Sequence, residues 1–207
     1  MNSTQQVTPA VASERMSATE DGLDGQTVRQ LRHVLGEVEQ TCVLFTDLVG
    51  STRLWETDPD RMASALARHD DIVEETIDAH GGSIFKWTGD GCCARFHPMG
   101  DAPAAALALL RAVRAERWET DEPLHLRIAL HAGPARRHRG GDLVGATLNH
   151  TARLLELCGS DHAIATAEAV RTLGYRRGRA EVWRSRGWTT LRDVGRPFEI
   201  FEATEPS

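Results

Sequence analysis

The chain has 207 residues, of which 41% are hydrophobic and 26% charged, and its net charge at pH 7 is −6. This length suits one domain with an extension, and this composition is typical of globular proteins. The negative charge argues against a role in binding nucleic acid, which generally requires a basic surface. An acidic protein that handles an anionic substrate needs cations between the two, which favours a bound metal.

The cysteines and the N-terminus indicate a cytoplasmic protein. Cys42, Cys92, Cys93 and Cys158 form no C-x-x-C pair, so a zinc site or a disulfide framework is not expected. Residues 1–14 lack the basic start and apolar core of a signal peptide. No apolar run approaches the roughly 18 residues of a membrane helix. We therefore expect no membrane association.

The first 40 residues divide into two segments. Residues 1–24 are polar and small, which predicts a disordered tail. Residues 25–40 are predicted to form an amphipathic helix, because apolar side chains recur at helical spacing: Val28, Leu31, Val34, Leu35 and Val38. This helix either packs on its own domain or forms a dimer contact or a link to a sensor.

The remainder alternates between strands and helices. The predicted elements are a strand (41–47), a helix (59–80), a hairpin (83–87 and 92–97), a helix (101–118), a strand (124–132), a basic loop (133–141), a helix (146–158), a strand (163–166), a short helix to about residue 173 and three weaker strands (182–186, 189–194 and 199–203). This order predicts an α+β domain at residues 41–205. Its core is ferredoxin-like, βαββαβ, with extra C-terminal strands.

Two aspartates stand at ends of these elements. Asp47 ends an apolar strand, and Asp90 lies in the hairpin turn T-G-D-G. A carboxylate at a strand end is badly placed for a core and well placed for a metal. Adjacent strands would bring both together to hold Mg²⁺ against a nucleoside triphosphate. Taken alone, Asp90 is better explained by the preference of aspartate for tight turns, but Asp47 and Lys86 on neighbouring strands favour a metal site.

Small residues after Asp47 suggest a phosphate cradle. Gly50, Ser51 and Thr52 stand between a strand and a helix start, where free backbone N–H groups and the helix dipole favour anions. The turn is not a Walker A loop, because the G-x-x-x-x-G-K-[ST] pattern is absent. Taken alone, this turn is a weak signal, and a plain capping turn is the favoured explanation.

Cationic and amide side chains form a third set of candidates. Lys86 lies in an apolar strand, either at an edge with its ammonium in water or directed into a pocket. Asn149 and Arg153 are four residues apart and share a helix face, so together they could stabilise charge on a phosphate. A solvated helix face is the alternative. Arg192 is either a second phosphate contact or an exposed strand arginine.

Together these segments resemble the class III nucleotide cyclase catalytic domain from about residue 41 to residue 203. The motifs that carry the resemblance are F-T-D-L-V-G-S-T at 45–52, F-K-W-T-G-D-G at 85–91, L-R-I-A-L-H-A-G at 126–133, G-D-L-V-G-A-T-L-N-H-T-A-R-L at 141–154 and L-R-D-V-G-R-P at 191–197. Each motif alone is weak. All of them in this order and at this spacing are specific.

The resemblance implies a metal-dependent cyclase that forms a 3′,5′-cyclic nucleoside monophosphate and pyrophosphate. Asp47 and Asp90 match the residues that bind two Mg²⁺ or Mn²⁺ ions per active site, and Leu48 matches a neighbour whose carbonyl also touches metal. Family members place each site between two chains. A homodimer would therefore contain two shared active sites.

The resemblance also assigns the substrate contacts. Lys86 and Asp142 match the pair that reads adenine, Asn149 the residue that orients the ribose, Arg153 the arginine that stabilises the pentavalent phosphorus, and Arg192 a phosphate-binding lysine. Trp87 departs from the family, because a small residue usually stands beside the base-reading lysine.

Three alternatives remain beside an adenylate cyclase. The first is a pyrimidine cyclase that acts on UTP or CTP, as in bacterial antiphage systems. Trp87 and the absence of a recognisable sensor domain support this alternative. A catalytically inactive nucleotide-sensing module is disfavoured because Asp47, Asp90, Asn149 and Arg153 are all present. A ferredoxin-like nucleic-acid binder is disfavoured by the net charge.

Overall fold

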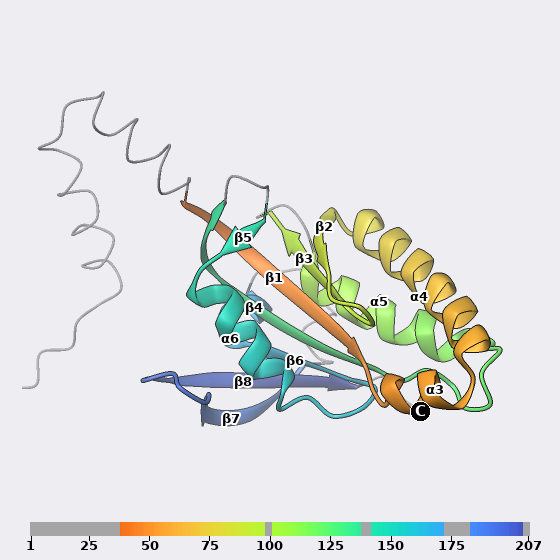
Figure 1. Ribbon diagram of the computed structural model, residues 1–207. Helices are drawn as coiled ribbons and strands as arrows, with labels where there is room; N and C mark the ends of the chain where they lie inside the picture. Colours follow the sequence, from red (N-terminus) through yellow and green to blue (C-terminus); the bar gives the residue numbers. More distant parts are fainter. Residues whose placement is uncertain (1–37, 98–100, 138–141, 172–182, 205–207) are drawn as a thin grey trace, which may run out of the picture. The chain divides into compact units, whose positions relative to one another are not determined.

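The computed structural model describes residues 38–97, 101–137, 142–171 and 183–204. In chain order its elements are β1 (Val38–Leu48), α3 (Ser51–Thr57), α4 (Pro59–Ala79), β2 (Gly82–Trp87), β3 (Cys92–Phe96), α5 (Ala102–Ala115), β4 (Leu126–Arg137), β5 (Leu143–Val144), α6 (Ala146–Leu155), β6 (His162–Thr166), α7 (Ala167–Arg171), β7 (Arg184–Thr190) and β8 (Pro197–Thr204). Figure 1 shows their arrangement around one sheet.

The sheet has the strand order β2-β3-β1-β4-β6-β8-β7, with β5 paired to β4. β1 is antiparallel to both β3 and β4, whereas β4 and β6 are parallel. The part β2-β3-β1-β4, connected through α4 and α5, has the order of a ferredoxin-like βαββαβ core. The predicted α+β fold with additional C-terminal strands is therefore confirmed.

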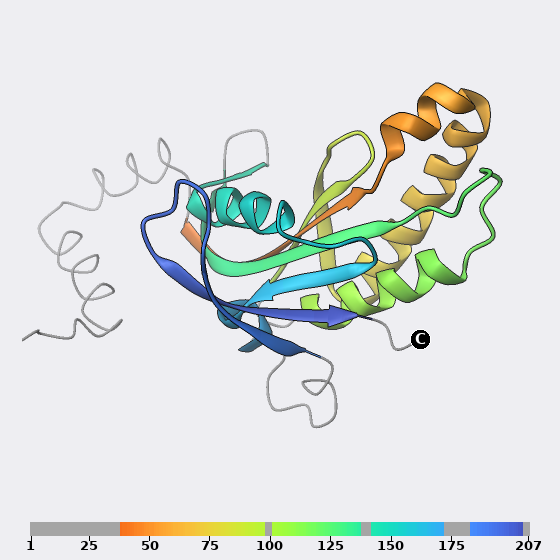
Figure 2. The ribbon, with the colours of Figure 1, turned by 90° about the horizontal axis from the view of Figure 1, so that it is seen from below.

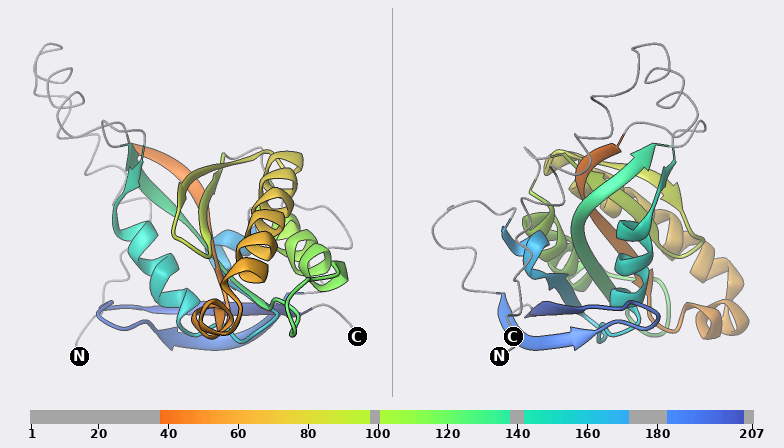
Figure 3. Two further views of the ribbon diagram at one scale, coloured as in Figure 1. Left: turned by 45° about the vertical axis from the view of Figure 1, so that its right-hand side comes forward. Right: turned by 90° about the vertical axis from the view of Figure 1, so that its left-hand side faces the viewer.

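Helices cover both faces of the sheet. α4 and α5 lie on one side and α6 on the other (Figure 3), as the view from below also shows (Figure 2). The larger core cluster joins α4 and α5 to the sheet and includes Leu44 and Leu48 of β1. Because side chains alternate along a strand, Asp47 lies on the opposite face, the one that carries α6. A smaller cluster beneath α6 includes Leu154 and Phe198.

Local signals set the ends of the two long helices. The Asp58 side chain accepts a hydrogen bond from the Arg61 N–H at 3.1 Å, and proline follows it at the first helical position of α4. Asp101 caps α5 in the same way through the Ala104 N–H at 3.1 Å.

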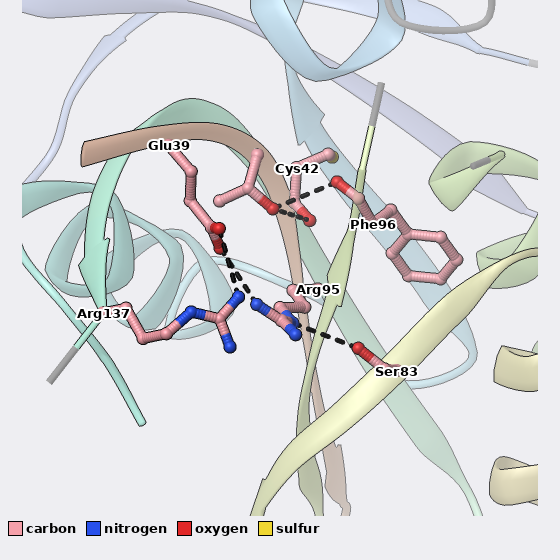
Figure 4. Close-up of polar contacts among 7 residues, drawn as sticks. Glu39, Cys42, Ser83, Arg95, Phe96 and Arg137 are labelled. Carbon is pink, nitrogen blue, oxygen red and sulfur yellow. Dashed lines mark hydrogen bonds and ion pairs between the residues drawn. The ribbon is translucent and has the colours of Figure 1, made fainter. Parts of the chain in front are cut away.

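A polar network joins β1, β2, β3 and β4 near the beginning of β1 (Figure 4). The Glu39 carboxylate accepts hydrogen bonds from Arg95 at 3.0 Å and from Arg137 at 3.2 Å, and Arg95 also donates to the Ser83 hydroxyl at 3.1 Å. Partial burial acts to raise the pKa of Glu39, but the two arginines outweigh it and lower the pKa. The Glu39 carboxylate therefore links β1 directly to β3 and β4, and Arg95 extends the link to β2.

Several element boundaries differ from the sequence-based expectation. Residues 38–40, expected to end the N-terminal helix, belong to β1 because they pair with residues 134–136 of β4. β4 continues to Arg137, so the first part of the expected basic loop is strand. The expected strands 182–186 and 189–194 are replaced by β7, which has an irregularity between Ser185 and Gly187. Residues 1–37, expected to contain the tail and most of the helix, lie outside the described residues.

The longest helices are amphipathic rather than uniformly apolar. α4 has a polar face with charged residues such as Asp60, Glu74 and Glu75, all exposed. Within the part of the chain that the structure describes, no helix combines the length and apolar composition needed to cross a membrane.

Candidate active site

Backbone hydrogen bonds bring Asp47 and Asp90 to the same place. The Leu48 N–H donates to the Asp90 carbonyl at 3.2 Å, which joins the end of β1 to the β2–β3 turn. A Cβ atom added at Gly91 would lie 2.1 Å from the Thr46 carbonyl oxygen, so only glycine permits this approach. The Cys92 N–H donates to the Thr46 hydroxyl at 2.9 Å beside it. We call the end of β1 with the turn that carries Asp90 the acidic corner.

Each carboxylate of the acidic corner has a partner. The Ser51 hydroxyl, buried at the beginning of α3, donates to the Asp90 carboxylate. Arg127 of β4 donates a hydrogen bond through Nε to one oxygen of Asp47 at 2.7 Å, and its Nη2 forms an ion pair with the same oxygen at 2.7 Å. Arg127 was not singled out from the sequence, because its position opposite Asp47 depends on the β1–β4 register.

The donors of the acidic corner fit a hard divalent cation. Two carboxylates at the end of one strand and the adjacent turn supply oxygen ligands of the type that Mg²⁺ and Mn²⁺ prefer. Within the described ranges, no group of three or more His, Cys, Asp or Glu side chains is gathered for a metal. Further ligands would therefore come from the backbone, such as the carbonyl of Leu48, from water or from a bound phosphate.

The turn after Asp47 differs in detail from a simple phosphate cradle. Gly50 has a φ of 73° and precedes α3, which has no side-chain cap. Thr52 is exposed in the first turn, whereas the Ser51 hydroxyl is bonded to Asp90. The Ser51 hydroxyl is therefore engaged by the Asp90 carboxylate. The predicted phosphate contact would have to come from the backbone N–H groups of these residues.

Lys86 and Asp142 converge on Cys93. Lys86 is the cross-strand partner of Cys93 in the β2–β3 pair. Burial raises the pKa of the Cys93 thiol to about 11, Lys86 acts to lower this pKa, and Asp142 acts to raise it. Both charged groups therefore lie within electrostatic range of one thiol, although they are far apart in the sequence. Both are exposed and available to a ligand.

Trp87 faces away from Lys86. It pairs with Cys92, whose side chain belongs to the core cluster beneath α4 and α5. Cys93, the partner of Lys86, pairs in turn with Phe45 of β1 on the other face. Successive residues of a strand project to opposite faces. The tryptophan is 36% exposed and lies on the α4 side.

A hollow of about 490 Å³ lies between α6 and the segment that connects β7 to β8. Its lining residues are Ala146, Asn149, His150, Ala152, Arg153, Arg192, Asp193 and Val194. Asn149 and Arg153 are one helical turn apart, as their spacing predicts. The structure therefore brings Arg192 to the same place as Asn149 and Arg153. We call this feature the α6 hollow.

An acidic residue that the sequence analysis missed is bonded to both arginines of the α6 hollow. Glu156 accepts a hydrogen bond from Arg153 at 2.6 Å and one from Arg192 at 2.8 Å. The spacing of three residues between Arg153 and Glu156 on a helix was a visible signal for the first contact. The contact with Arg192, 36 residues away in the chain, required the fold.

The candidate residues thus fall into three groups: the acidic corner, the Lys86–Asp142 pair and the α6 hollow. The lining of the α6 hollow includes neither Asp47 nor Asp90.

Comparison with known protein families identifies the family to which the chain belongs. The family model described as the adenylate and guanylate cyclase catalytic domain matches residues 34–192. The chain belongs to this family. The class III nucleotidyl cyclase expected from the motifs is therefore confirmed at the level of the family, and all of the site residues predicted from the sequence lie inside the matched segment.

Relatives and solved cyclase structures agree with this assignment. The uncharacterized protein Rv0891c of Mycobacterium tuberculosis is 35% identical over 167 residues, which are 79% of this chain and 55% of that protein. The chain thus spans about half the length of this curated relative. The adenylyl cyclase CyaB from P. aeruginosa superposes with a TM-score of 0.69 at 16% identity, covering 83% of this chain and 96% of the other.

A guanylate cyclase domain gives a similar result. The domain of RhGC from Catenaria anguillulae, solved in complex with GTP, has a TM-score of 0.70 at 17% identity and covers 83% of this chain and all of that one. At these identities the two structures establish the shared fold. Because they belong to an adenylyl and a guanylyl cyclase, the fold alone does not select the base.

Proposed function

We propose that this protein converts ATP to 3′,5′-cyclic AMP and pyrophosphate. The observation that carries the choice of base is that Lys86 lies on the face of the β2–β3 hairpin that carries Cys93, where Asp142 also acts electrostatically, whereas Trp87 lies on the other face. A cation and a carboxylate suit the ring nitrogen and the amino group of adenine. With Trp87 behind the strand, its bulk leaves room for a purine.

The acidic corner would hold the metal. Asp47 and Asp90 would bind Mg²⁺ or Mn²⁺, two ions per active site, with the Leu48 carbonyl as a further ligand. Bound metal would supply Lewis acidity at the ribose 3′-hydroxyl and would neutralise the triphosphate. Ser51 would orient the Asp90 carboxylate through its hydrogen bond. The backbone N–H groups at residues 50–52 would contact phosphate.

The α6 hollow would supply orientation and charge. Asn149 would orient the ribose, so that its 3′-oxygen faces the α-phosphorus in line with the leaving pyrophosphate. Arg153 would stabilise the negative charge that accumulates on the pentavalent phosphorus, and Arg192 would hold a phosphate of the leaving group. A planar guanidinium suits this task because it donates to two oxygens at once.

We further propose that the active unit is a homodimer with two shared sites. The support is that the acidic corner and the α6 hollow form separate groups within one chain. In a head-to-tail pair, the metal-binding group of one protomer would face the base and phosphate group of its partner. Two equivalent sites would result from the two-fold symmetry.

The decisive experiment is incubation of the purified protein with ATP, GTP, CTP and UTP in turn, each with Mn²⁺. Mass spectrometry then identifies the cyclic product. Cyclic AMP as the main product supports the proposal. Cyclic UMP or cyclic CMP would instead support a pyrimidine cyclase, and the absence of any cyclic nucleotide would support an inactive nucleotide-sensing module. Asp47→Asn protein is the control for contaminating cyclases.

A further inference from the structure

One carboxylate oxygen of Glu156 accepts hydrogen bonds from both arginines of the α6 hollow. Arg153 Nη1 lies 2.6 Å from Glu156 Oε1, and Arg192 Nη2 lies 2.8 Å from the same atom. Two guanidinium groups from α6 and from the β7–β8 connection therefore converge on a single anionic point. The arrangement is that of two arginines around one phosphate oxygen, with the protein itself supplying the anion.

A second acid supports the same pair of arginines. Asp193 Oδ2 lies 3.8 Å from Arg153 Nη2 and 4.0 Å from Arg192 Nε. Asp193 is 78% exposed and its contacts are longer, so Glu156, at 46% exposed, is the principal partner. The hydrogen bond from Arg153, followed by the charge of Arg192, lowers the pKa of Glu156. The carboxylate is therefore ionised when a nucleotide arrives.

We propose that Glu156 occupies the phosphate position between Arg153 and Arg192 and must move aside when a phosphate of the nucleotide binds there. This inference rests on the proposed function and adds a positioning residue to it. Glu156 holds the two guanidinium groups at one point before substrate binds. It also competes with the substrate for them, so it should weaken the binding of phosphate.

The geometry makes this exchange possible. Glu156 follows the last residue of α6, and its side chain is about half exposed, so it has room to rotate into water. Exposed ion pairs contribute little net stability, so their loss is readily offset by a more highly charged ligand. Removal of the Glu156 charge should therefore leave the fold intact while changing the affinity for phosphate.

The test is a titration of the protein with inorganic pyrophosphate by calorimetry, at low ionic strength and with EDTA present. Without metal, binding depends on the protein's cations. We expect Glu156→Gln to tighten the dissociation constant by about two- to fivefold, the range expected for one partly exposed charge pair. Glu156→Asp, which keeps the charge but shortens its reach, should give an intermediate value.

Two matched variants show where the pyrophosphate binds. Glu74→Gln removes an exposed acid of α4 and should leave the dissociation constant unchanged, which excludes an effect of net charge alone. Arg192→Ala combined with Glu156→Gln should remove the gain. Equal or weaker binding in Glu156→Gln than in the parent, or an equal gain in Glu74→Gln, overturns the proposal.

This result is separate from the outcome for the proposed function. The pyrophosphate titration requires no turnover, whereas the assay with nucleoside triphosphates tests catalysis directly. If the parent forms a cyclic nucleotide and Glu156→Gln does not tighten pyrophosphate, only the role of Glu156 is wrong. In an active parent, Glu156→Gln should also lower the KM for the triphosphate by a similar factor.

Discussion

Arg127 lies directly opposite Asp47 across the β1–β4 pair, where its Nε donates a hydrogen bond to one carboxylate oxygen at 2.7 Å and its Nη2 lies 2.7 Å from the same oxygen. The second oxygen of Asp47 makes no hydrogen bond within that pair. One carboxylate can therefore hold Arg127 on one side and offer a ligand on the other. The ion pair fixes the orientation of Asp47, which a metal site at a strand end requires.

Removal of either carboxylate of the acidic corner should abolish cyclisation without unfolding the protein. We expect Asp47→Asn and Asp90→Ala to lower kcat/KM by about 10³-fold or more, because each loses a metal ligand. Both side chains lie at turns and are partly exposed, so little packing is lost. The measurements are turnover at saturating Mn²⁺ and thermal unfolding. Substantial turnover in a folded variant would contradict the metal assignment.

Two inactive variants should complement each other if the site is shared between chains. Asp47→Ala lacks the acidic corner, and Arg153→Ala lacks the phosphate arginine of the α6 hollow. In a mixed dimer, one of the two sites contains neither substitution. Mixing the proteins and allowing subunit exchange should restore a fraction of the parent activity. Exchange demonstrated by labelled subunits, without any return of activity, would show that each site lies within one chain.

The opposite orientations of Lys86 and Trp87 predict different effects of their substitution. Lys86→Ala should reduce the preference for ATP by about 10²-fold, because a buried polar edge of the base would lose its partner. Trp87→Thr should lower stability more than it changes selectivity. The measurement is kcat/KM for the four nucleoside triphosphates in each variant, together with denaturant unfolding. A relaxed base preference in Trp87→Thr alone would mean that the tryptophan narrows the pocket.

Gly91 should tolerate no side chain. Its Cβ would lie 2.1 Å from the Thr46 carbonyl oxygen, a backbone atom, so Gly91→Ala must push the β2–β3 turn away from β1. We expect a loss of about 1–3 kcal/mol in the free energy of unfolding, together with most of the activity. Gly195→Ala is the matched control, because nothing lies within 4 Å of its Cβ position. Denaturant titration gives the free energy of unfolding of both variants. A loss in Gly91→Ala alone indicates a local clash, whereas an equal loss in Gly195→Ala indicates a general effect of replacing glycine with alanine.

Buried His131 should make the protein less stable in acid. Burial, followed by the charge of His150, lowers the pKa of His131 to about 4, from an ordinary value of 6.5. The unfolded chain therefore binds a proton more readily between these values, and stability falls as the pH drops from about 6.5 to about 4. The largest contribution from this group is about 3 kcal/mol.

The contribution of His131 can be isolated by substitution. His131→Asn should flatten the dependence of unfolding free energy on pH within this window, although it also loses the hydrogen bond between His131 and the Thr166 hydroxyl at 2.9 Å. His97→Asn, at an exposed position, should leave the dependence as in the parent. A parent whose stability is constant from pH 7 to pH 4 would contradict the prediction.

The local chemistry of the candidate site could be predicted from the amino-acid sequence. The apolar run before Asp47 predicted that this residue ends a strand, and the glycines beside Asp90 predicted a hairpin turn. Helical spacing predicted that Asn149 and Arg153 share one helix face. These placements depend on residues within a few positions of each other, where turn preferences and helix periodicity act directly. The motifs in order were also sufficient for the family and for the ferredoxin-like core.

Which of these residues contact one another depends on the folded sheet. Arg127 faces Asp47 because of the β1–β4 register, and Arg192 reaches Glu156 because the β7–β8 connection folds back onto α6. The orientation of Trp87 follows from the β2–β3 register, which shifts between Ile84 and Lys86. Register is set by the packing of the whole sheet, and a shift of one residue reverses every side chain. No local pattern in the sequence contains that information.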